Sequence, residues 1–412
     1  MPGYKHSDVG VIPDDWDAKA IGEEIDLLTG FPFLSSGYSK SGVRLLRGSN
    51  IKRGETDWSD DIVQYWPEVS RELARYSLQV GDLVVSMDGS LVGRSFAQLR
   101  DSDLPALLLQ RVARIRGKKM DVTYLRQFVG SDQFIKYVDS VKTVTAIPHI
   151  SPGDIRRFTI PVPPTIEEQR AIAQALSDVD ALLATLDQVI AKKRDLKQAT
   201  MQQLLTGKAR LPGFSGEWEV KRLEELAEIR SGGTPSTGEP SFWDGDIPWC
   251  TPTDITALNG HKYLHETSRL ITPLGLNASS AEMIPAQSVV MTSRATIGEC
   301  AINAVPLSTN QGFKNFIPFA KTDVDFLYYL LGTQKQGLIA LCGGSTFLEI
   351  GKTQLAAYEV RLPSTKAEQT AIATVLSEMD AELSVLESRR DKTRNIKQAM
   401  MQELLTGKTR LV

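Results

Sequence analysis

Residues 163–211 read PPTIEEQRAIAQALSDVDALLATLDQVIAKKRDLKQATMQQLLTGKARL, and residues 363–411 read PSTKAEQTAIATVLSEMDAELSVLESRRDKTRNIKQAMMQELLTGKTRL. The two segments are offset by 200 residues without a gap, and 27 of their 49 positions are identical. Chance does not produce agreement of this extent, so the chain contains an internal duplication.

Each copy predicts one long helix. Thr165 and Thr365 each stand three residues before a glutamate, Glu168 or Glu368. This is the spacing of a capping box, in which the hydroxyl accepts from a first-turn N–H and the glutamate reaches back. Gly207 and Gly407 stand where such helices would end. The roughly 40 residues between cap and glycine correspond to a helix of about 60 Å.

Apolar residues in both copies recur at alternating steps of four and three, which is typical of a coiled-coil seam. The predicted seam consists of Ile172, Leu176, Val179, Leu183, Leu186 and Ile190 in the first copy and Ile372, Leu376, Met379, Leu383 and Leu386 in the second. It stops at the charged segments 192–194 and 392–394, and we expect it to resume in a different phase at Leu196 and Ile396. The charged segments are either solvated interruptions or surfaces for a partner or a phosphate. Because a seam needs a partner, we expect the two helices to pair antiparallel with approximate two-fold symmetry.

The segments in front of the two helices resemble each other weakly. Residues 84–87 match residues 289–292, and Gln110 matches Gln311. We therefore expect an α+β protein with four parts, in which two similar domains at 1–162 and 209–362 are each followed by a long helix at 163–208 and 363–412. Each domain is predicted to hold a small sheet with helices and long loops, with strands at 83–87, 111–115 and 288–292, helices at 122–138 and 324–340, and a loop at 231–240.

Charge is distributed unevenly along the chain, whose formal net charge is −3. Residues 1–162 hold 21 basic and 21 acidic side chains, whereas residues 212–362 hold 11 basic and 16 acidic ones. A free-standing DNA-binding protein of high affinity usually has a strongly basic face, so this balance argues against one. Three cysteines far apart in the sequence form no disulfide framework, and no segment has 18 consecutive apolar residues. We expect a cytoplasmic protein with no membrane segment.

The sequence contains several partial matches to catalytic motifs, and each lacks a residue or a spacing that the motif requires. Gly351-Lys352-Thr353 lacks the glycine that a phosphate-binding loop needs five residues earlier, where Thr346 stands. His265-Glu266 lacks the second histidine of a zinc-protease helix. The carboxylates of residues 14–17 are too close together to occupy neighbouring strands of a nuclease, and the four histidines form no metal-ligand pattern. We expect no catalytic residue, no metal site and no cofactor.

Several motifs carry a resemblance to a known family. These are EQRAIA (168–173) and EQTAIA (368–373), the helix ends KQATMQQLLTGK (197–208) and KQAMMQELLTGK (397–408), and the domain openings VIPDDW (11–16) and SGEWEVKRLEEL (215–226). With the alternation of domain and helix, they make essentially the whole chain similar to the specificity subunits of type I restriction-modification systems.

The resemblance implies a non-catalytic subunit that binds double-stranded DNA, two methyltransferase subunits and, for cleavage, endonuclease/translocase subunits. S-adenosylmethionine and ATP would belong to those partners. Each recognition domain would read one half of an asymmetric bipartite target, and the helices would set the spacing between the halves and bind the methyltransferase subunits. Two other interpretations remain open: a coiled-coil adaptor that joins proteins without sequence-specific DNA binding, and a self-contained nuclease or methyltransferase.

Polar and basic residues on predicted loops are the candidates for DNA contact, because base edges are read by such side chains. In the first domain they are Arg44, Arg47, Ser49, Asn50, Lys52, Arg53, Ser90, Arg94, Lys142, Thr143, Thr145 and His149. In the second domain they are Thr251, Thr253, Ser293, Arg294, Asn310, Gln311, Lys314, Ser345 and Thr346. We expect Arg47 and Arg294 to serve different half-sites.

Overall fold

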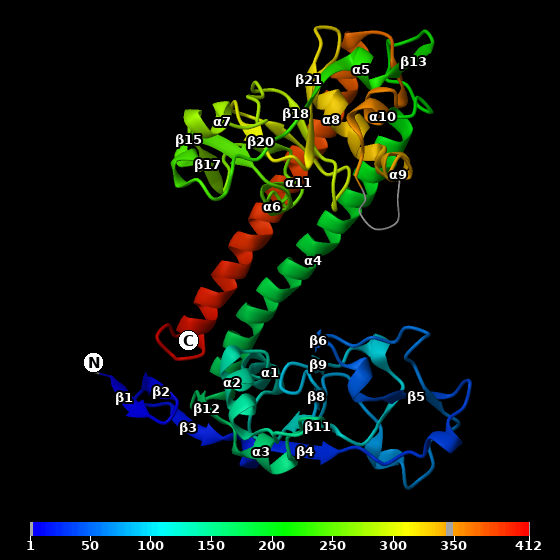
Figure 1. Cartoon of the computed structure of the whole chain (residues 1–412). Coiled ribbons are helices and arrows are strands. Elements are labelled where there is room, and N and C mark those ends of the chain that lie inside the picture. Colours follow the sequence, from blue (N-terminus) through cyan, green and yellow to red (C-terminus); the bar gives the residue numbers. More distant parts are fainter. Residues whose placement is uncertain (1–2, 343–348, 412) are drawn as a thin grey trace. The chain divides into compact units, whose positions relative to one another are not determined.

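A computed structural model describes residues 3–342 and 349–411 (Figure 1). The contacts divide the chain into two units. Unit 1 contains Met1–Thr185 and Arg390–Val412, and unit 2 contains Leu186–Arg389. Each long helix therefore contributes one part of its length to each unit.

Unit 1 contains two main sheets. One has five strands in the order β4–β11–β8–β9–β6, and the other has three strands in the order β10–β5–β7. The strands of the first sheet are β4 (Ile25–Thr29), β11 (Val112–Gly117), β8 (Leu83–Ser86), β9 (Phe96–Gln98) and β6 (Arg53–Gly54). Those of the second are β10 (Ala106–Leu108), β5 (Val43–Leu46) and β7 (Tyr65–Trp66). The remaining strands of unit 1 are a hairpin of β1 (Tyr4–Ser7) and β2 (Gly10–Pro13), and an antiparallel pair of β3 (Asp17–Ala20) with β12 (Thr159–Val162), which are far apart in the sequence.

Unit 2 repeats this plan with the same strand order. Its five-stranded sheet consists of β14 (Ala227–Ser231), β21 (Phe313–Pro318), β18 (Val289–Thr292), β19 (Cys300–Asn303) and β16 (Tyr263–Leu264). Its three-stranded sheet consists of β17 (Arg269–Ile271), β15 (Trp243–Cys250) and β20 (Ser308–Thr309), and β13 (Trp218–Arg222) pairs with β22 (Glu359–Pro363). The predictions of an α+β fold, of one fold used twice, and of strands at 83–87, 111–115 and 288–292 are confirmed.

The predicted single helices at 122–138 and 324–340 are each two helices, so these predictions were wrong in detail. In unit 1, α1 (Val122–Val129) ends at Gly130, and the Ser131 side chain accepts from the backbone N–H of Phe134 to begin α2 (Asp132–Val141). In unit 2, α8 (Val324–Thr333) and α9 (Lys335–Ala340) meet at Gln334. The remaining helices are α3 (Pro152–Arg157), α4 (Ile166–Leu204), α5 (Leu223–Leu226), α6 (Pro252–Ala257), α7 (Pro273–Asn277), α10 (Lys352–Ala356) and α11 (Lys366–Leu404).

The long helices α4 and α11 pair antiparallel, as expected. Within unit 1, Lys397 of α11 contacts Asp180 of α4 at 2.6 Å. Within unit 2, Lys193 contacts Glu382 at 2.7 Å, and Lys197 contacts Asp380. The residue numbers of the contacting residues decrease along α11 as they increase along α4. The two helices therefore run antiparallel.

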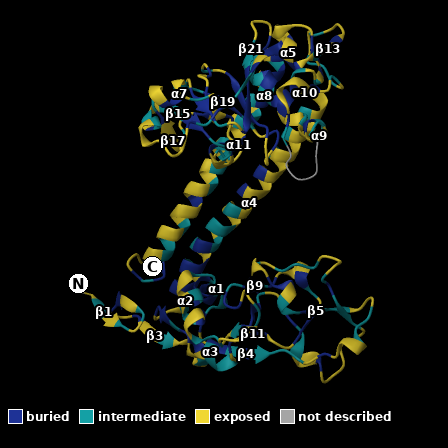
Figure 2. Cartoon of the chain, in the orientation of Figure 1, coloured by how far each residue is buried: buried dark blue, intermediate teal, exposed yellow. Residues whose placement is uncertain are grey.

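The ends of both helices are part of the domain cores. Ile172 and Leu176 of α4 lie in the core of unit 1 together with Leu404 and Leu405 from the end of the chain. Leu204 and Leu205 lie in the core of unit 2 in the same way, with Ile372 and Leu376 of α11. The first seam residues therefore pack against a domain as well as a helix, while much of the length of both helices is exposed (Figure 2).

The middle of the predicted seam varies in burial. Leu186, Ile190 and Leu383 are buried, and Val179, Leu183, Met379 and Leu386 are half-buried. The predicted resumption at Leu196 and Ile396 was wrong, because these side chains are 52% and 57% exposed. Their neighbours Lys197 and Lys397 face the other helix and bind aspartates there, and the half-buried Met201 and Met401 follow one turn later.

The predicted capping boxes form only in part. Thr165 Oγ1 accepts from the backbone N–H of Glu168 at 3.2 Å, and Thr365 does the same for Glu368 at 3.4 Å. Among the contacts of the described residues, the two glutamate carboxylates bind arginines and not the backbone N–H groups of Thr165 and Thr365. Glu168 accepts from Arg410, and Glu368 accepts from Arg210 at 2.5 and 2.7 Å. We call these two contacts, Glu168–Arg410 and Glu368–Arg210, the helix-end ion pairs.

Each helix-end ion pair joins the start of one long helix to the segment after the other. The Glu168 side chain is 1% exposed, and Arg410 also binds Asp15 at 3.0 Å. Hydrogen bonds to Glu168 and Asp15 raise the pKa of Arg410 above its ordinary value. Gly207 and Gly407 both have a φ of +71°, which lets the chain turn after each helix without side-chain strain. No helix in the described part of the chain is apolar enough over its length to span a bilayer.

Replacing Arg410 by alanine should destabilise unit 1 by about 3 kcal/mol, because the substitution leaves the buried Glu168 carboxylate without its cation. Thermal or denaturant unfolding measures this loss. Arg394→Ala is the matched control: Arg394 pairs with Asp391 on an exposed helix face, so its loss should cost less than about 1 kcal/mol. Equal effects of the two substitutions would contradict the role given to the helix-end ion pair.

Candidate nucleic-acid interface

Three connections of unit 1 meet at one end of its sheets. They are the short 3-10 helix Gly48–Asn50 after β5, the turn after β8, and the turn between β10 and β11. Together they line a hollow of about 400 Å³ whose polar lining includes Ser49, Lys52, Asp88, Ser90, Gln110 and Arg111. Segments far apart in sequence thus form one polar rim.

Arg111 is a rim residue that the sequence did not single out. It has a φ of +66°, its carbonyl accepts from the backbone N–H of Met87 at 2.9 Å, and its side chain is 65% exposed. Its Nη1 lies 2.9 Å from Asp88 Oδ2. The match of the preceding Gln110 with Gln311 was the signal that could have pointed to this turn.

The predicted residues between α2 and α3 lie beside this rim. Gly89 N donates to Pro148 O at 3.0 Å, and Thr143 Oγ1 and His149 Nδ1 are 2.9 Å apart. Thr145 Oγ1 bonds to the carbonyl of Ile147 in the same loop.

Two basic side chains of this part of unit 1 share one carboxylate. Lys142 and Arg94 bind Asp139 at 2.6 and 3.2 Å, and these hydrogen bonds lower the pKa of the aspartate. The structure thus brings Ser90, Arg94, Lys142, Thr143, Thr145 and His149 into one region of unit 1.

Other predicted residues of unit 1 hold the loops in shape. Arg44 donates to the carbonyls of Ser102 and Leu104 at 2.9 and 2.8 Å, and its guanidinium lies over Trp58. The half-buried Arg47 donates to Ile62 O. Asn50 is fully buried, and its amide bonds to Arg47 N and Asp57 O. Arg53 lines a separate hollow next to Arg126 and Asp180.

The matching end of unit 2 gathers Ser293, Arg294, Asn310 and Gln311. Ser293 N donates to Gly312 O at 2.7 Å, and Arg294 Nη2 lies 2.7 Å from Glu349 Oε2. Asn310 Oδ1 accepts from Gly312 N at 2.9 Å, and Gln311 accepts from Thr234. The buried Ser293 hydroxyl has no hydrogen-bond partner within the described residues.

The remaining candidate residues of unit 2 differ in burial and in the contacts that they make. Lys314 lies in β21 and is 5% exposed, and burial lowers its pKa although Glu349 opposes the shift. Thr251 is the N-cap residue of α6, and its hydroxyl and backbone N–H both donate to Asp254 Oδ2 at 2.7 Å, whereas Thr253 is exposed on that helix. Ser345 and Thr346 lie outside the described residues.

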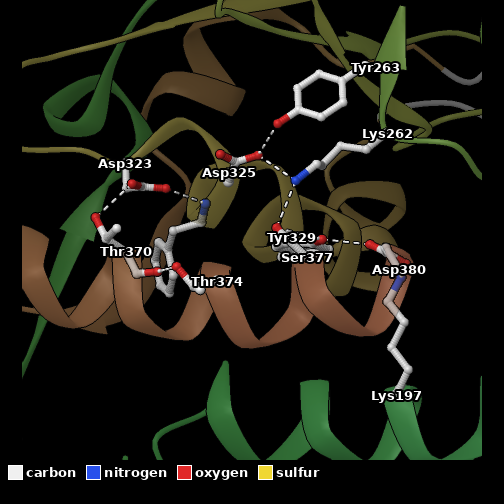
Figure 3. A network of polar contacts seen from close by, with 11 residues as sticks. Lys197, Lys262, Tyr263, Asp323, Asp325, Tyr329, Thr370, Thr374, Ser377 and Asp380 are labelled. Carbon is white, nitrogen blue, oxygen red and sulfur yellow. Dashed lines mark hydrogen bonds and ion pairs between the residues drawn. The ribbon is translucent and has the colours of Figure 1, made fainter. Parts of the chain in front are cut away.

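A polar network anchors the sheet of unit 2 on the long helices (Figure 3). Lys262 Nζ donates to Asp325 Oδ1 at 2.6 Å and to Ser377 Oγ of α11 at 2.9 Å. Tyr329 of α8 donates to Asp380 Oδ2 at 2.6 Å, and Asp380 also binds Lys197 of α4. The Lys262 side chain is only 8% exposed.

The corresponding lysine of unit 1 has different partners. Lys52, which likewise precedes an edge strand paired with its sheet in parallel, bonds to Ser49 O at 3.0 Å and lies 3.5 Å from Asp57. A hollow of about 890 Å³ next to Lys262 is lined by His261, His265 and Glu378 among others. Within the described residues, no three histidine, cysteine or acidic side chains are grouped to hold a metal ion.

Comparison with known proteins decides the family. A family model described as "Type I restriction modification DNA specificity domain" matches residues 13–192 and again residues 215–393. The chain belongs to this family. Its two matches coincide with the duplicated plan of sheet, peripheral helices and long helix, so the chain carries two specificity domains.

Curated relatives from Methanocaldococcus jannaschii agree with this assignment. The MjaIX specificity subunit is 40% identical over 166 residues, which are 40% of this chain and 38% of that protein. The putative MjaX specificity subunit is 24% identical over 431 residues, covering 99% of this chain and 97% of that protein. The matches thus span half or less of the MjaIX and MjaVIII subunits but nearly all of MjaX.

Two solved structures share the fold. The S subunit of a type I restriction-modification system from M. genitalium covers 98% of this chain and 99% of its own, with a TM-score of 0.63 and 16% identity. A chain from a structural study of assembly in the type I system covers 97% and 99%, with a TM-score of 0.55 and 18% identity. Both likenesses extend over nearly the whole chain.

Replacing Lys262 by methionine should lower the stability of unit 2 by roughly 1–3 kcal/mol, because Asp325 and Ser377 lose a partly buried donor. Thermal unfolding measures the effect. Lys335→Met is the control, since Lys335 forms an exposed pair with Glu299 and its loss should cost less than about 1 kcal/mol. A methionine at 262 that leaves stability unchanged would show that the network does not anchor the domain.

Proposed function

We propose that this chain is the DNA-sequence-reading, non-catalytic subunit of a type I restriction-modification complex, and that each of its two domains reads one half of an asymmetric bipartite target. One observation carries the proposal. The two units have the same strand order, while the loops at the same end of each sheet carry different polar side chains. One scaffold with two different reading surfaces suits two unlike half-sites.

The functional parts proposed are recognition domains at 1–162 and 209–362 and spacer helices at 163–208 and 363–412. The helix-end ion pairs support the second role, because they hold both ends of each helix in register. Two helices held in this way would fix the number of base pairs between the half-sites.

The net charge of the chain supports the proposal that partner subunits share the contacts with the DNA backbone. The net charge is −3, whereas phosphate contacts depend on basic side chains. We therefore propose that two methyltransferase subunits supply much of the backbone contact, and that endonuclease/translocase subunits join for cleavage. S-adenosylmethionine and ATP would be bound by those partners, and the reactions would take place there.

A coiled-coil adaptor without sequence-specific DNA binding is the second candidate. The exposed apolar side chains Leu182, Leu196 and Ile396 on the long helices suit protein partners under either interpretation. The two interpretations differ in the polar loops at the sheet ends. Only the DNA-reading interpretation gives these loops a role, which is contact with the target sequence.

Sequencing of modified bases in cells that express this chain with its methyltransferase subunit tests the proposal. Cells without the chain are the control. We expect a new methylated motif made of two short, unlike halves around a fixed gap. An assembled complex that adds no chain-dependent methylation would contradict sequence reading and favour the adaptor.

Shortening both helices should shorten the gap without changing either half-site. Removing residues 185–191 and 386–392 takes seven residues from each helix and leaves the residues of both helix-end ion pairs in place. A loss of seven residues shortens each helix by about 10 Å, or roughly three base pairs. Removal of residues 185–191 alone is the control, and it should impair folding because the ends no longer match. An altered half-site sequence would contradict the division of roles.

A further inference from the structure

The two domains place an arginine–carboxylate pair at the same end of the sheet but build it from different elements. In unit 1 the carboxylate Asp88 follows β8, and the arginine, Arg111, lies in the turn between β10 and β11. In unit 2 the arginine, Arg294, follows β18, and the carboxylate is Glu349.

Backbone contacts establish that these positions correspond. Asp88 and Arg294 each stand two residues beyond the end of a matching strand, and they form isolated bridges with His149 and Glu349 respectively. Arg111 and Gly312 correspond because each carbonyl accepts from the residue just after β8 or β18. The arginine has thus moved from one connection to the other between the two copies.

A contribution to folding stability does not explain why arginines occupy these two positions. The side chains of Arg111 and Arg294 are 65% and 47% exposed, and exposed ion pairs contribute little to folding. Arg111 also has a positive φ, which is unfavourable for a residue with a Cβ. Yet Leu109 and Val112 on either side of its turn are buried, so the position from which the side chain projects is well fixed.

We propose that Arg111 and Arg294 each read a guanine in the major groove, one in each half-site, and that Asp88 and Glu349 orient them before DNA binds. The guanidinium has five N–H donors in one plane, and two of them fit the O6 and N7 acceptors of guanine. Arg111 uses Nη1 for Asp88, and Arg294 uses Nη2 for Glu349, so donors remain for a base in both cases. A side chain already held in place loses less conformational freedom on binding.

Because the two arginines stand on different connections, they should reach different positions within their half-sites. This inference deepens the proposed function and rests on it. Arg111 was not among the residues that the sequence predicted to contact DNA.

The test is methylation by the chain assembled with its methyltransferase subunit, measured on oligonucleotide duplexes that carry each base in turn at every position of the motif. The motif itself is first determined with the unaltered chain. Arg111→Ala should reduce discrimination for guanine at one position of one half-site by about tenfold to hundredfold, and leave the other half-site unchanged. Arg294→Ala should do the same in the other half-site.

Two further variants keep the result interpretable. Arg111→Lys retains the charge but loses the planar pair of donors, so it should restore the rate of methylation more than the discrimination. Arg71→Ala, which removes an exposed arginine between β7 and β8, should leave the motif and the rate unchanged.

The outcomes separate this inference from the function on which it rests. An unaltered chain that yields no motif in an assembled complex would remove the proposed function and this inference with it. An unaltered chain that yields a motif, together with Arg111→Ala and Arg111→Lys variants that keep full discrimination at every position, would overturn this inference alone.

Discussion

A buried carboxylate–guanidinium contact determines how the chain closes on itself. Glu168 and Glu368 stand at the start of the long helices with almost no exposed surface, and each is bound by an arginine just beyond the end of the other helix. A buried carboxylate without a cation would be strongly destabilising, so the two segments must stay together. The last residues of the chain thereby become part of the first domain.

This contact explains why each unit contains pieces far apart in the sequence. Leu404 and Leu405 complete the core of unit 1, and Leu204 and Leu205 complete that of unit 2. Tyr4 and Asp15 of the first unit contact residues 407–410. The helices and the domain cores therefore form one continuous scaffold in each unit, whereas exposed polar side chains such as Ser49 and Arg111 project from the loops at the sheet ends. Such loops can change sequence without loss of the fold.

Much of this organisation could be predicted because it repeats. The 200-residue offset revealed the two helices and their pairing, and the short apolar runs located the central strands β8, β11 and β18. The role of Glu168 could not be predicted from its spacing to Thr165, because the same spacing serves a glutamate that folds back and one that binds an arginine 242 residues away. The seam after residue 194 was misplaced for a similar reason: Lys197 and Lys397, not the apolar Leu196 and Ile396, face the other helix.

The residues of the candidate interface could likewise be predicted only in part, because their contacts join segments that are far apart in the sequence. Composition selected loops rich in arginine, serine and asparagine, but it could not distinguish Arg44, Arg47 and Asn50, which donate to backbone carbonyls elsewhere in unit 1, from side chains that project outward. Arg111 stands between apolar strands, where local sequence gives no sign of exposure. Only the folded arrangement brings it next to Asp88 and into correspondence with the arginine–carboxylate pair of the second unit.

The most direct measurement is the methylation motif of a chain in which residues 212–362 are replaced by residues 10–162. If the helices and their end contacts form a scaffold that is equivalent for both domains, this chain should assemble with the methyltransferase subunit. It should then direct methylation to an inverted repeat of the first half-site, with the original gap between the halves. A folded and assembled chimera that retains the original second half-site, or that recognises the two halves with a different gap, would contradict the separation of scaffold from sequence reading.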